Sequence, residues 1–403
     1  MHNPSLQTGT PALSRPLAQR LFPLLSLSLS SLLPLANSLA QEAPVITITK
    51  TDKIALGLQN FSGPEGPAIA QIVQKDLQLS GMFSLTGPNS GNFQVSGISS
   101  GNLLRGVLSE RSGKPPLLER SYPGNSRAQA HAFANDIVET LTGTKGIAGS
   151  RIAFIATQSG HKEIYLVDAD GSNRVQLTND RNLSVSPSLS NDGRKLLYTG
   201  YQSGYPDVYE IDLQSGARRR IMKYPGTNSG AAYSPDGSRI AVTLSKDGNP
   251  ELYVTQSSGD SPRRLTMTPG VESSPTWSPD GREIIYSSDT SGGPALYRIS
   301  ASGGTPQLLR TGQSYNTEPN WSPDGKLVAF SAREGGAFTV AILELATGKV
   351  RLLSEGQDPV WGPNSRHLVY AQGSNLILLD TQTLQKTPIV SGLGKISEPS
   401  WTR

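Results

Sequence analysis

Short apolar runs recur at nearly constant spacing through the last 250 residues. Leu196–Tyr198, Ile240–Val242, Ile284–Tyr286, Val328–Phe330 and Leu368–Tyr370 form one series. A second series is marked by Tyr165, Tyr209, Tyr253 and Tyr297, each 44 residues after the last. A third, polar-edged series contains Leu177, Ile221, Leu265, Leu308, Leu352 and Ile389. With the strand described next, these runs predict four short strands per unit of 40 to 44 residues, which is typical of a β-propeller blade.

The fourth series carries every tryptophan of the chain. Leu189, Tyr233, Trp277, Trp321, Trp361 and Trp401 align with spacings of 44, 44, 44, 40 and 40 residues. Most are followed by Ser-Pro-Asp-Gly or a variant of it, in which Pro, Asp and Gly each favour a tight turn. We therefore interpret Asp192, Asp236, Asp280 and Asp324 as turn residues rather than acid catalysts or cation ligands, and the tryptophans as packing between blades.

The two ends of the repeat region complement each other. Counting from Ile152–Ile155 gives six units, but the first lacks its own Pro-x-Trp strand, and Pro399-Ser400-Trp401 has no unit after it. We expect the carboxy-terminal strand to complete the first blade, because this closes the ring and removes free sheet edges. The expected fold is a small α/β domain followed by an all-β six-bladed propeller.

The segment before the repeats has a different pattern. Val45–Thr49 alternates and is β-branched, and Ile54–Leu58 predicts a second strand. Helices are expected over Ala68–Leu79, stopped by Gly81, and over Arg127–Leu141, ended by Gly143. Two or three strands are expected within Phe93–Tyr122. We place an amino-terminal arm at 41–53, the α/β domain at 54–148 and the propeller at 149–403.

Residues 1–40 are typical of a secretory signal. Arg15 and Arg20 precede an apolar run from Leu21 to Leu35, and Ser38-Leu39-Ala40 predicts cleavage after Ala40. The run is too short and too interrupted by proline for a membrane span. Removing residues 1–40 lowers the formal net charge from +4 to +2, because this segment contains two arginines and no acidic residue. A secreted chain without cysteine favours a bacterial periplasm.

Composition excludes several classes of function. Charged residues make up only 17% of the chain, so neither disorder by self-repulsion nor nucleic-acid binding is expected. The absence of cysteine excludes disulfides and thiolate metal sites. With 42 Gly and 29 Pro, the chain is rich in turns.

The chain shows no common catalytic design. It contains no Gly-x-Ser-x-Gly, Walker, Gly-x-Gly-x-x-Gly or His-Glu-x-x-His motif. After the signal, only His131, His161 and His367 remain, and they are scattered, so we expect no metal centre and no cofactor. Asp168-Ala169-Asp170-Gly171 is interpreted as a tight turn, and Arg218-Arg219-Arg220 as a solvated outer strand.

The loops that enter the innermost strands should converge on one mouth of the channel. They are polar, small and mixed in charge, which suits a protein partner better than a buried small substrate. The candidate contact residues at this mouth are Asn182, Thr227, Asn228, Ser273, Ser274, Thr317, Glu318, Asp358 and Glu398.

Taken together, these features resemble the TolB family, the periplasmic component of the Tol-Pal system. The resemblance is carried by the repeats, by Phe61-Ser62-Gly63-Pro64, by Asp76–Phe83, and by the junction Leu141-Thr142-Gly143-Thr144-Lys145-Gly146 leading to Ser150–Phe154. The stretch 87–122 is shorter than is usual in the family, and Thr227-Asn228 stands where a member can carry His-Asn.

The resemblance implies a non-enzymatic, monomeric adaptor. It would bind the peptidoglycan-associated lipoprotein Pal through the mouth and the inner-membrane-anchored TolA through Val45, Ile46 and Ile48 of the arm. Such an adaptor supports outer-membrane integrity and envelope constriction during cell division. An extended β-branched arm can pair with a partner's sheet edge or fold back on its own protein, so Pal docking could bias which state it adopts.

The sequence leaves two other hypotheses about the function open. A periplasmic carbohydrate- or peptidoglycan-binding module would need exposed aromatics near the mouth, for which Tyr201, Tyr205 and Tyr315 are the candidates. An enzyme related to propeller peptidases or lyases would need a hydrolase domain or clustered histidines, and the chain offers neither.

Overall fold

The computed structural model describes residues 53–403, which form two helices, one five-stranded sheet and six four-stranded sheets. The signal, its cleavage site Ala40 and the arm residues Val45, Ile46 and Ile48 lie outside the described residues. Neither helix of residues 53–403 is long and apolar enough to cross a membrane.

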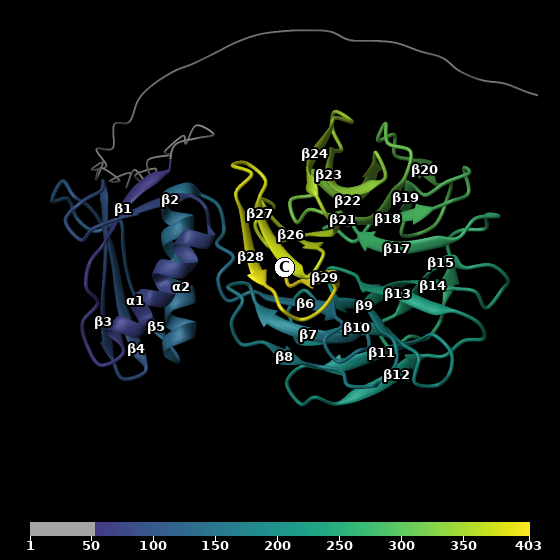
Figure 1. The fold of residues 1–403 in the computed structure, drawn as a ribbon, viewed down its shortest axis with the longest axis horizontal. Helices are drawn as coiled ribbons and strands as arrows, with labels where there is room; N and C mark the ends of the chain where they lie inside the picture. The colour runs from purple at the N-terminus through teal and green to yellow at the C-terminus, as the bar shows by residue number, and fades with distance from the viewer. Residues whose placement is uncertain (1–52) are drawn as a thin grey trace, which may run out of the picture. The chain divides into compact units, whose positions relative to one another are not determined.

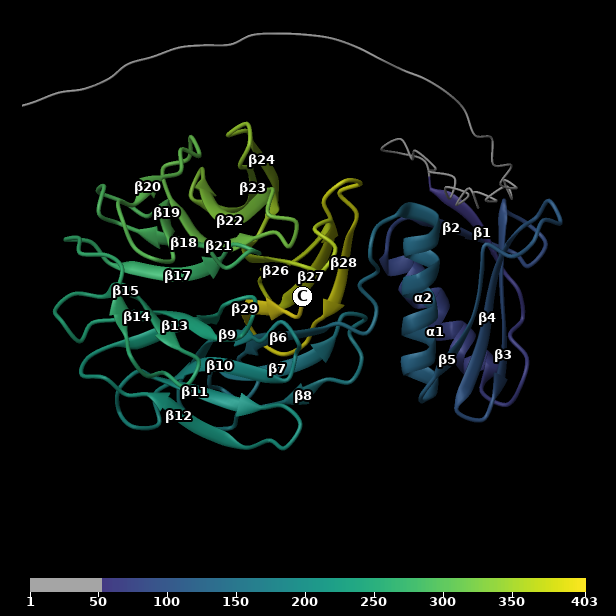
Figure 2. The same cartoon turned by 180° about the vertical axis from the view of Figure 1, so that it is seen from behind.

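The first unit of the fold is a mixed α/β sheet. Its strand order is β2-β1-β3-β4-β5, with β1 parallel to both β2 and β3 and the other pairs antiparallel. Helices α1 and α2 cover one face of this sheet (Figure 2). The bounds are β1 (Ile54–Leu58), α1 (Gly66–Leu79), β2 (Phe83–Thr86), β3 (Phe93–Ser100), β4 (Leu103–Glu110), β5 (Leu118–Pro123) and α2 (Ser126–Thr142).

Local signals explain where the two helices start and stop. Helix α2 begins after Asn125, whose side chain accepts a hydrogen bond from the backbone N–H of Ala128 at 3.0 Å, a common N-cap contact. It ends at Thr142 and is capped by Gly143. The φ of Gly143 is +66°, a left-handed conformation that glycine commonly adopts at the end of a helix. Both predicted helices are confirmed to within two residues, whereas strand β2, which starts two residues after Gly81, was not predicted.

The remaining sheets are the six propeller blades (Figure 1). Each has four antiparallel strands in chain order, except that the last strand of the chain joins the first blade. The strands are, for blade 1, β29 (Ile396–Trp401), β6 (Arg151–Ala156), β7 (Glu163–Asp168) and β8 (Val175–Gln176); for blade 2, β9 (Ser184–Leu189), β10 (Lys195–Gly200), β11 (Asp207–Asp212) and β12 (Arg218–Met222); for blade 3, β13 (Asn228–Tyr233), β14 (Arg239–Leu244), β15 (Glu251–Gln256) and β16 (Arg263–Arg264); for blade 4, β17 (Glu272–Trp277), β18 (Glu283–Ser288), β19 (Ala295–Ser300) and β20 (Gln307–Leu308); for blade 5, β21 (Asn316–Trp321), β22 (Leu327–Glu334), β23 (Ala337–Glu344) and β24 (Val350–Glu355); and for blade 6, β25 (Gln357–Trp361), β26 (His367–Gln372), β27 (Asn375–Asp380) and β28 (Lys386–Val390).

The predicted closure of the ring is confirmed. Strand β29 pairs antiparallel with β6, with Ile396 opposite Ala156 and Trp401 opposite Ile152, and the two strands lie side by side in both views (Figures 1 and 2). The indole N–H of Trp401 donates to Ser150 Oγ at 2.8 Å. All four tryptophans are at most 3% exposed, as expected for packing between blades.

The repeated aspartates act as turn residues. In each of the four turns the serine two residues earlier donates its hydroxyl to the aspartate, and the aspartate accepts a backbone N–H from two residues later. Gly171 closes the turn at 168–171 by donating its N–H to Asp168 O at 2.8 Å. Both predictions of turn chemistry are therefore confirmed.

The three consecutive arginines need a partial correction. They do lie on an outer strand, β12, but each makes an ion pair instead of being only solvated: Arg218 with Asp180 at 2.7 Å, Arg219 with Glu210 at 2.8 Å and Arg220 with Asp207 at 3.0 Å. The sequence did not show these pairs, because their acids come from a neighbouring strand and from a loop.

Candidate functional site

The innermost strand of every blade contains a bulge at the same place. The pairing of β9, β13, β17, β21, β25 and β29 with the next strand shifts register there. One residue in each bulge has a positive φ, between 47° and 61°. These bulge residues are Ser186, Gly230, Ser274, Glu318, Asp358 and Glu398. Bulges of this kind re-aim side chains, and here all six residues line one cavity.

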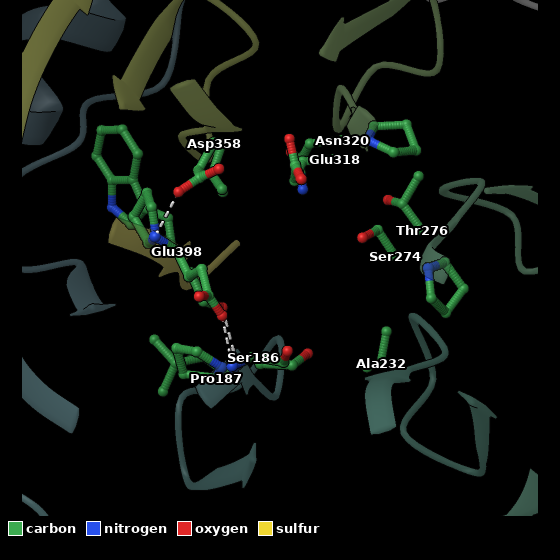
Figure 3. Close-up of a pocket in the computed structure, with 18 of the residues that line it drawn as sticks. Ser186, Pro187, Ala232, Ser274, Thr276, Glu318, Asn320, Asp358 and Glu398 are labelled. Carbon is green, nitrogen blue, oxygen red and sulfur yellow. Dashed lines mark hydrogen bonds between the residues drawn. The ribbon is translucent and has the colours of Figure 1, made fainter. Parts of the chain in front are cut away.

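The cavity has a volume of about 590 Å³ and is formed by all six blades. Figure 3 shows five of the bulge residues around its open centre, namely Ser186, Ser274, Glu318, Asp358 and Glu398. Glu318, Asp358 and Glu398 come from blades 5, 6 and 1, whereas blades 2, 3 and 4 contribute Ser186, Gly230 and Ser274. The acidic groups are therefore concentrated on one side of the cavity.

Backbone and lysine donors hold two of these carboxyl groups. Glu398 accepts the backbone N–H of Ser186 at 2.7 Å and the ammonium of Lys162 at 3.4 Å. Asp358 accepts the backbone N–H of Glu398 at 2.8 Å. These contacts, drawn in part in Figure 3, join the inner strands of blades 6, 1 and 2.

Burial and mutual repulsion make this cluster electrostatically unusual. Burial, followed by the charges of Glu318 and Glu398, raises the pKa of Asp358 to about 7. Burial is also the main cause of the raised pKa of Glu318. Among residues 53–403, neither Glu318 nor Asp358 has a cationic side chain within ion-pair distance. The cavity thus holds two carboxyl groups whose ionised forms are under-compensated.

Five of the nine candidate mouth residues line this cavity: Ser273, Ser274, Glu318, Asp358 and Glu398. The other four, Asn182, Thr227, Asn228 and Thr317, lie outside its lining. Asn228 is fully buried, and its amide accepts from Tyr224 N–H at 2.9 Å and donates to Tyr224 O at 2.8 Å. Its side chain fixes the shape of its own loop.

The list of candidate contact residues omitted Ser186 and Gly230, which end two of the entering loops, and also Lys162 and Arg403, although all four line the cavity. A signal for the first two was present, because the bulge residues follow the same 44, 44, 44, 40 and 40 spacing as the tryptophans, and five of the six precede a proline. The guanidinium of Arg403 donates to Trp321 O at 2.6 Å.

Other chemistry is not assembled in the described residues. Within 53–403, no group of three or more His, Asp or Glu side chains is arranged to hold a metal ion. His131 bonds Asp76 at 2.7 Å, His161 is exposed, and burial lowers the pKa of the fully buried His367 to about 4. Tyr205 is 71% exposed, but Tyr201, Tyr205 and Tyr315 do not line the cavity.

Comparison with known proteins identifies the family. Residues 138–403 match the family model described as the TolB beta propeller domain. The chain belongs to the TolB family. The TolB crystal structure from Acinetobacter baumannii superposes with a TM-score of 0.79 at 26% identity, covering 87% of this chain and 97% of that one. This likeness extends through the α/β sheet as well as the propeller.

Curated TolB relatives match over shorter regions. The TolB homologue of Chlorobaculum tepidum is 37% identical over 146 residues, which are 30% of this chain and 34% of that protein. The Tol-Pal system protein TolB of Bordetella avium is 33% identical over 223 residues, 47% of this chain and 51% of that protein. The chain therefore aligns with about a third to a half of these TolB proteins, and it is a homologue of the Tol-Pal system protein TolB.

Proposed function

We propose that this TolB homologue is a periplasmic, non-enzymatic adaptor. It binds Pal through the mouth of the propeller and TolA through the amino-terminal arm, and so supports outer-membrane integrity and envelope constriction during division. The proposal is supported by membership of the TolB family and by one feature of the site. Glu318 and Asp358 line an open cavity without a cationic partner among the described residues, so a protein that supplies a basic or hydrogen-bond-donating group there gains attraction.

The mouth is tested by neutralising these two carboxyl groups. We expect Glu318→Gln and Asp358→Asn to weaken binding to the soluble domain of Pal by about tenfold or more at pH 8. Both substitutions should at the same time raise the thermal midpoint, because they remove like charges from a buried cluster. Titration calorimetry of residues 41–403, together with thermal unfolding, measures both effects.

A matched control removes the same charge elsewhere. Glu139 is an exposed residue of α2, and Glu139→Gln should leave Pal affinity unchanged. Asn228→Ala is a poor probe, because it would leave buried groups of its own loop unpaired. Unchanged Pal affinity in both mouth variants would refute the mouth as the site. No binding by the unaltered protein would instead favour the carbohydrate-binding module, to be tested at Tyr201, Tyr205 and Tyr315.

The arm provides a second, independent prediction. Deleting 41–48, which removes Val45, Ile46 and Ile48, should abolish TolA binding and leave Pal binding intact. The reason is that an extended β-branched segment can add as a strand to a partner's sheet edge, while the mouth is built from other residues. Pull-down with the purified partner domains separates the outcomes. Loss of both interactions, or of neither, would contradict the separation of roles.

A further inference from the structure

A repeated backbone hydrogen bond joins the start of the third strand of blades 1 to 4 to the start of the next inner strand. The third strand of blades 1 to 4 begins with Glu163, Asp207, Glu251 and Ala295, and the inner strand of the following blade begins with Ser184, Asn228, Glu272 and Asn316. Within both sets, each residue is 44 positions after the last. Blade 3 differs from the others, because its third strand begins with an acid, Glu251, and the next inner strand begins with a second acid, Glu272.

In blade 2 the equivalent pair makes a direct contact. The Asn228 amide donates to Asp207 Oδ1 at 3.4 Å, so a neutral donor meets a carboxylate. Glu272 takes the place of that asparagine, and an ionised carboxylate has no hydrogen to donate. To make the same contact with Glu251, one of the two carboxyl groups has to carry a proton.

Both glutamates are fully buried, with 0% exposure. Glu251 Oε1 accepts from Arg264 Nη2 at 2.7 Å and from Thr268 N–H at 2.8 Å. Glu272 Oε1 accepts from the hydroxyls of Thr268 and Ser288, both at 2.8 Å. One oxygen of each carboxyl group is thereby satisfied.

The second oxygen of each group, Oε2, is buried and has no hydrogen-bond donor among the described residues. Thr268 ties the two carboxyl groups together, because its N–H donates to Glu251 and its hydroxyl donates to Glu272. Two buried acceptors without donors are costly, and a single proton shared between them would satisfy both. A metal ion would need several more free oxygens than these two.

The charges around the pair lead to the same conclusion. Arg264 on β16 is the one described cation within ion-pair distance of Glu251, and none is that close to Glu272. Asp247, in the hairpin before β15, is bonded to Lys246 and to the Tyr253 hydroxyl. Asp289, after β18, accepts the backbone N–H of Val271 at 2.8 Å. One guanidinium therefore faces two carboxyl groups, and one bound proton restores neutrality.

We propose that Glu251 and Glu272 bind one shared proton and that this proton site anchors the loop 266–271 at the mouth of the propeller. Thr268 in this loop contacts both glutamates, and Met267 and Val271 of the same loop are 81% and 46% exposed. Glu272 also directly precedes the cavity residues Ser273 and Ser274. Loss of the proton leaves two buried like charges and weakens the anchor, so the mouth becomes sensitive to pH.

The titration of the pair gives the direction of the effect. Burial, together with the neighbouring Glu251, raises the pKa of Glu272 from 4.5 to about 7. For Glu251 burial acts in the same sense, but its hydrogen bonds outweigh burial and lower its pKa. The folded protein thus holds a proton on Glu272 that the unfolded chain releases, and stability is lost as the pH rises from 4.5 through 7.

The test compares urea unfolding of the full protein and of Glu272→Gln at pH 5.5 and 8.5. The glutamine amide can donate to Glu251 without titrating. From pKa values of 4.5 and about 7, the unfolding equilibrium constant of the unaltered protein should rise about 30-fold more than that of the variant between these pH values. In Glu272→Gln, the infrared band of protonated carboxyl groups should lose one contribution at pH 5.5. The protection of the amides of loop 266–271 from hydrogen exchange should depend less on pH than in the unaltered protein.

Two further variants keep the test decisive. Glu272→Asn copies the residue of the neighbouring blades at 228 and 316 and should behave like Glu272→Gln. Glu163→Gln is the matched control, because it removes the buried acid at the equivalent position of blade 1, which accepts from the Thr178 hydroxyl and the Arg181 N–H. The proposal is overturned if the unaltered protein and both Glu272 variants share one pH dependence and the carboxyl band is unchanged. Pal binding is not a readout, so this test and that of the proposed function fail independently.

Discussion

A variant that ends at Glu398 is expected to lose the cooperative unfolding of the propeller. The missing residues include Ser400 and Trp401, which pair with Ala153 and Ile152 of β6 and complete the first blade. Ser400 Oγ also accepts the backbone N–H of Leu189 in blade 2 at 2.9 Å. Without these residues, this part of β6 becomes an open sheet edge. The strand pairing that closes the ring is then lost from the first blade.

A graded version of this experiment is Trp401→Ala. Trp401 is 3% exposed and belongs to the core cluster between blades 6 and 1, so its truncation should cost about 3 to 5 kcal/mol in the free energy of unfolding. Urea denaturation monitored by far-ultraviolet circular dichroism measures this cost. Leu384→Ala, at a position 50% exposed, is the control and should change little. A Trp401→Ala protein with an unaltered midpoint would show that the closing strand does not support the ring.

Replacing Arg366 by methionine should destabilise the protein by about 3 to 5 kcal/mol. The guanidinium binds both oxygens of Asp380, at 3.0 and 2.6 Å, and the two side chains are 13% and 3% exposed. The variant leaves a buried carboxylate with only Gln382 N–H and the Thr383 hydroxyl as donors. Removal of one partner from a buried pair costs more than the pair itself contributes.

The pH dependence of Arg366→Met provides a sharper check. Burial acts to raise the pKa of Asp380, but Arg366, together with His367 and the Gln382 N–H, outweighs burial and holds this pKa below 3.8. This lowered pKa contributes stability above the ordinary pKa that is lost as the pH falls through the folded value. The destabilisation by Arg366→Met should therefore be larger at pH 7 than at pH 4, as measured by urea unfolding.

Two further variants make this result interpretable. Adding Asp380→Asn to Arg366→Met removes the unpaired charge and should recover part of the loss, whereas a purely steric effect would not be recovered. The exposed pair of Arg105 and Glu119 is the matched surface control, and Arg105→Met should cost no more than about 1 kcal/mol. Equal costs at the buried and exposed pairs would contradict the assigned role of burial.

The balance between burial and charge also connects stability to the proposed function. Glu318 and Asp358 gain no compensating cation in the described residues, and burial raises the pKa of both. Groups that reduce stability and yet line an open cavity are candidates for contact with a partner. This is why the mouth variants are expected to become more stable while they bind Pal more weakly.

The sequence by itself determined the number of blades, their strand order and the closure of the ring. Each of these depends on local and periodic information: apolar runs that fix strands, Ser-Pro-Asp-Gly turns, and a final Pro-x-Trp strand that the first unit lacks. The two helices followed from apolar spacing and from Gly81 and Gly143 as stops. Strand β2 escaped because four residues are too few for a periodic pattern to stand out.

Tertiary structure alone decided which polar residues meet at the mouth. Five of the nine residues that the sequence selected line the cavity, and in each inner strand a bulge with positive φ places one backbone position, from Ser186 to Glu398, in its wall. The spacing in the sequence marks Asp358 and Glu398 as a repeated position, but it does not show that they line the cavity while Asn182 and Asn228 do not. The proton site of Glu251 and Glu272 was equally hidden, because its partners come from different blades, and burial changes the chemistry of a carboxyl group only once the fold has brought them together.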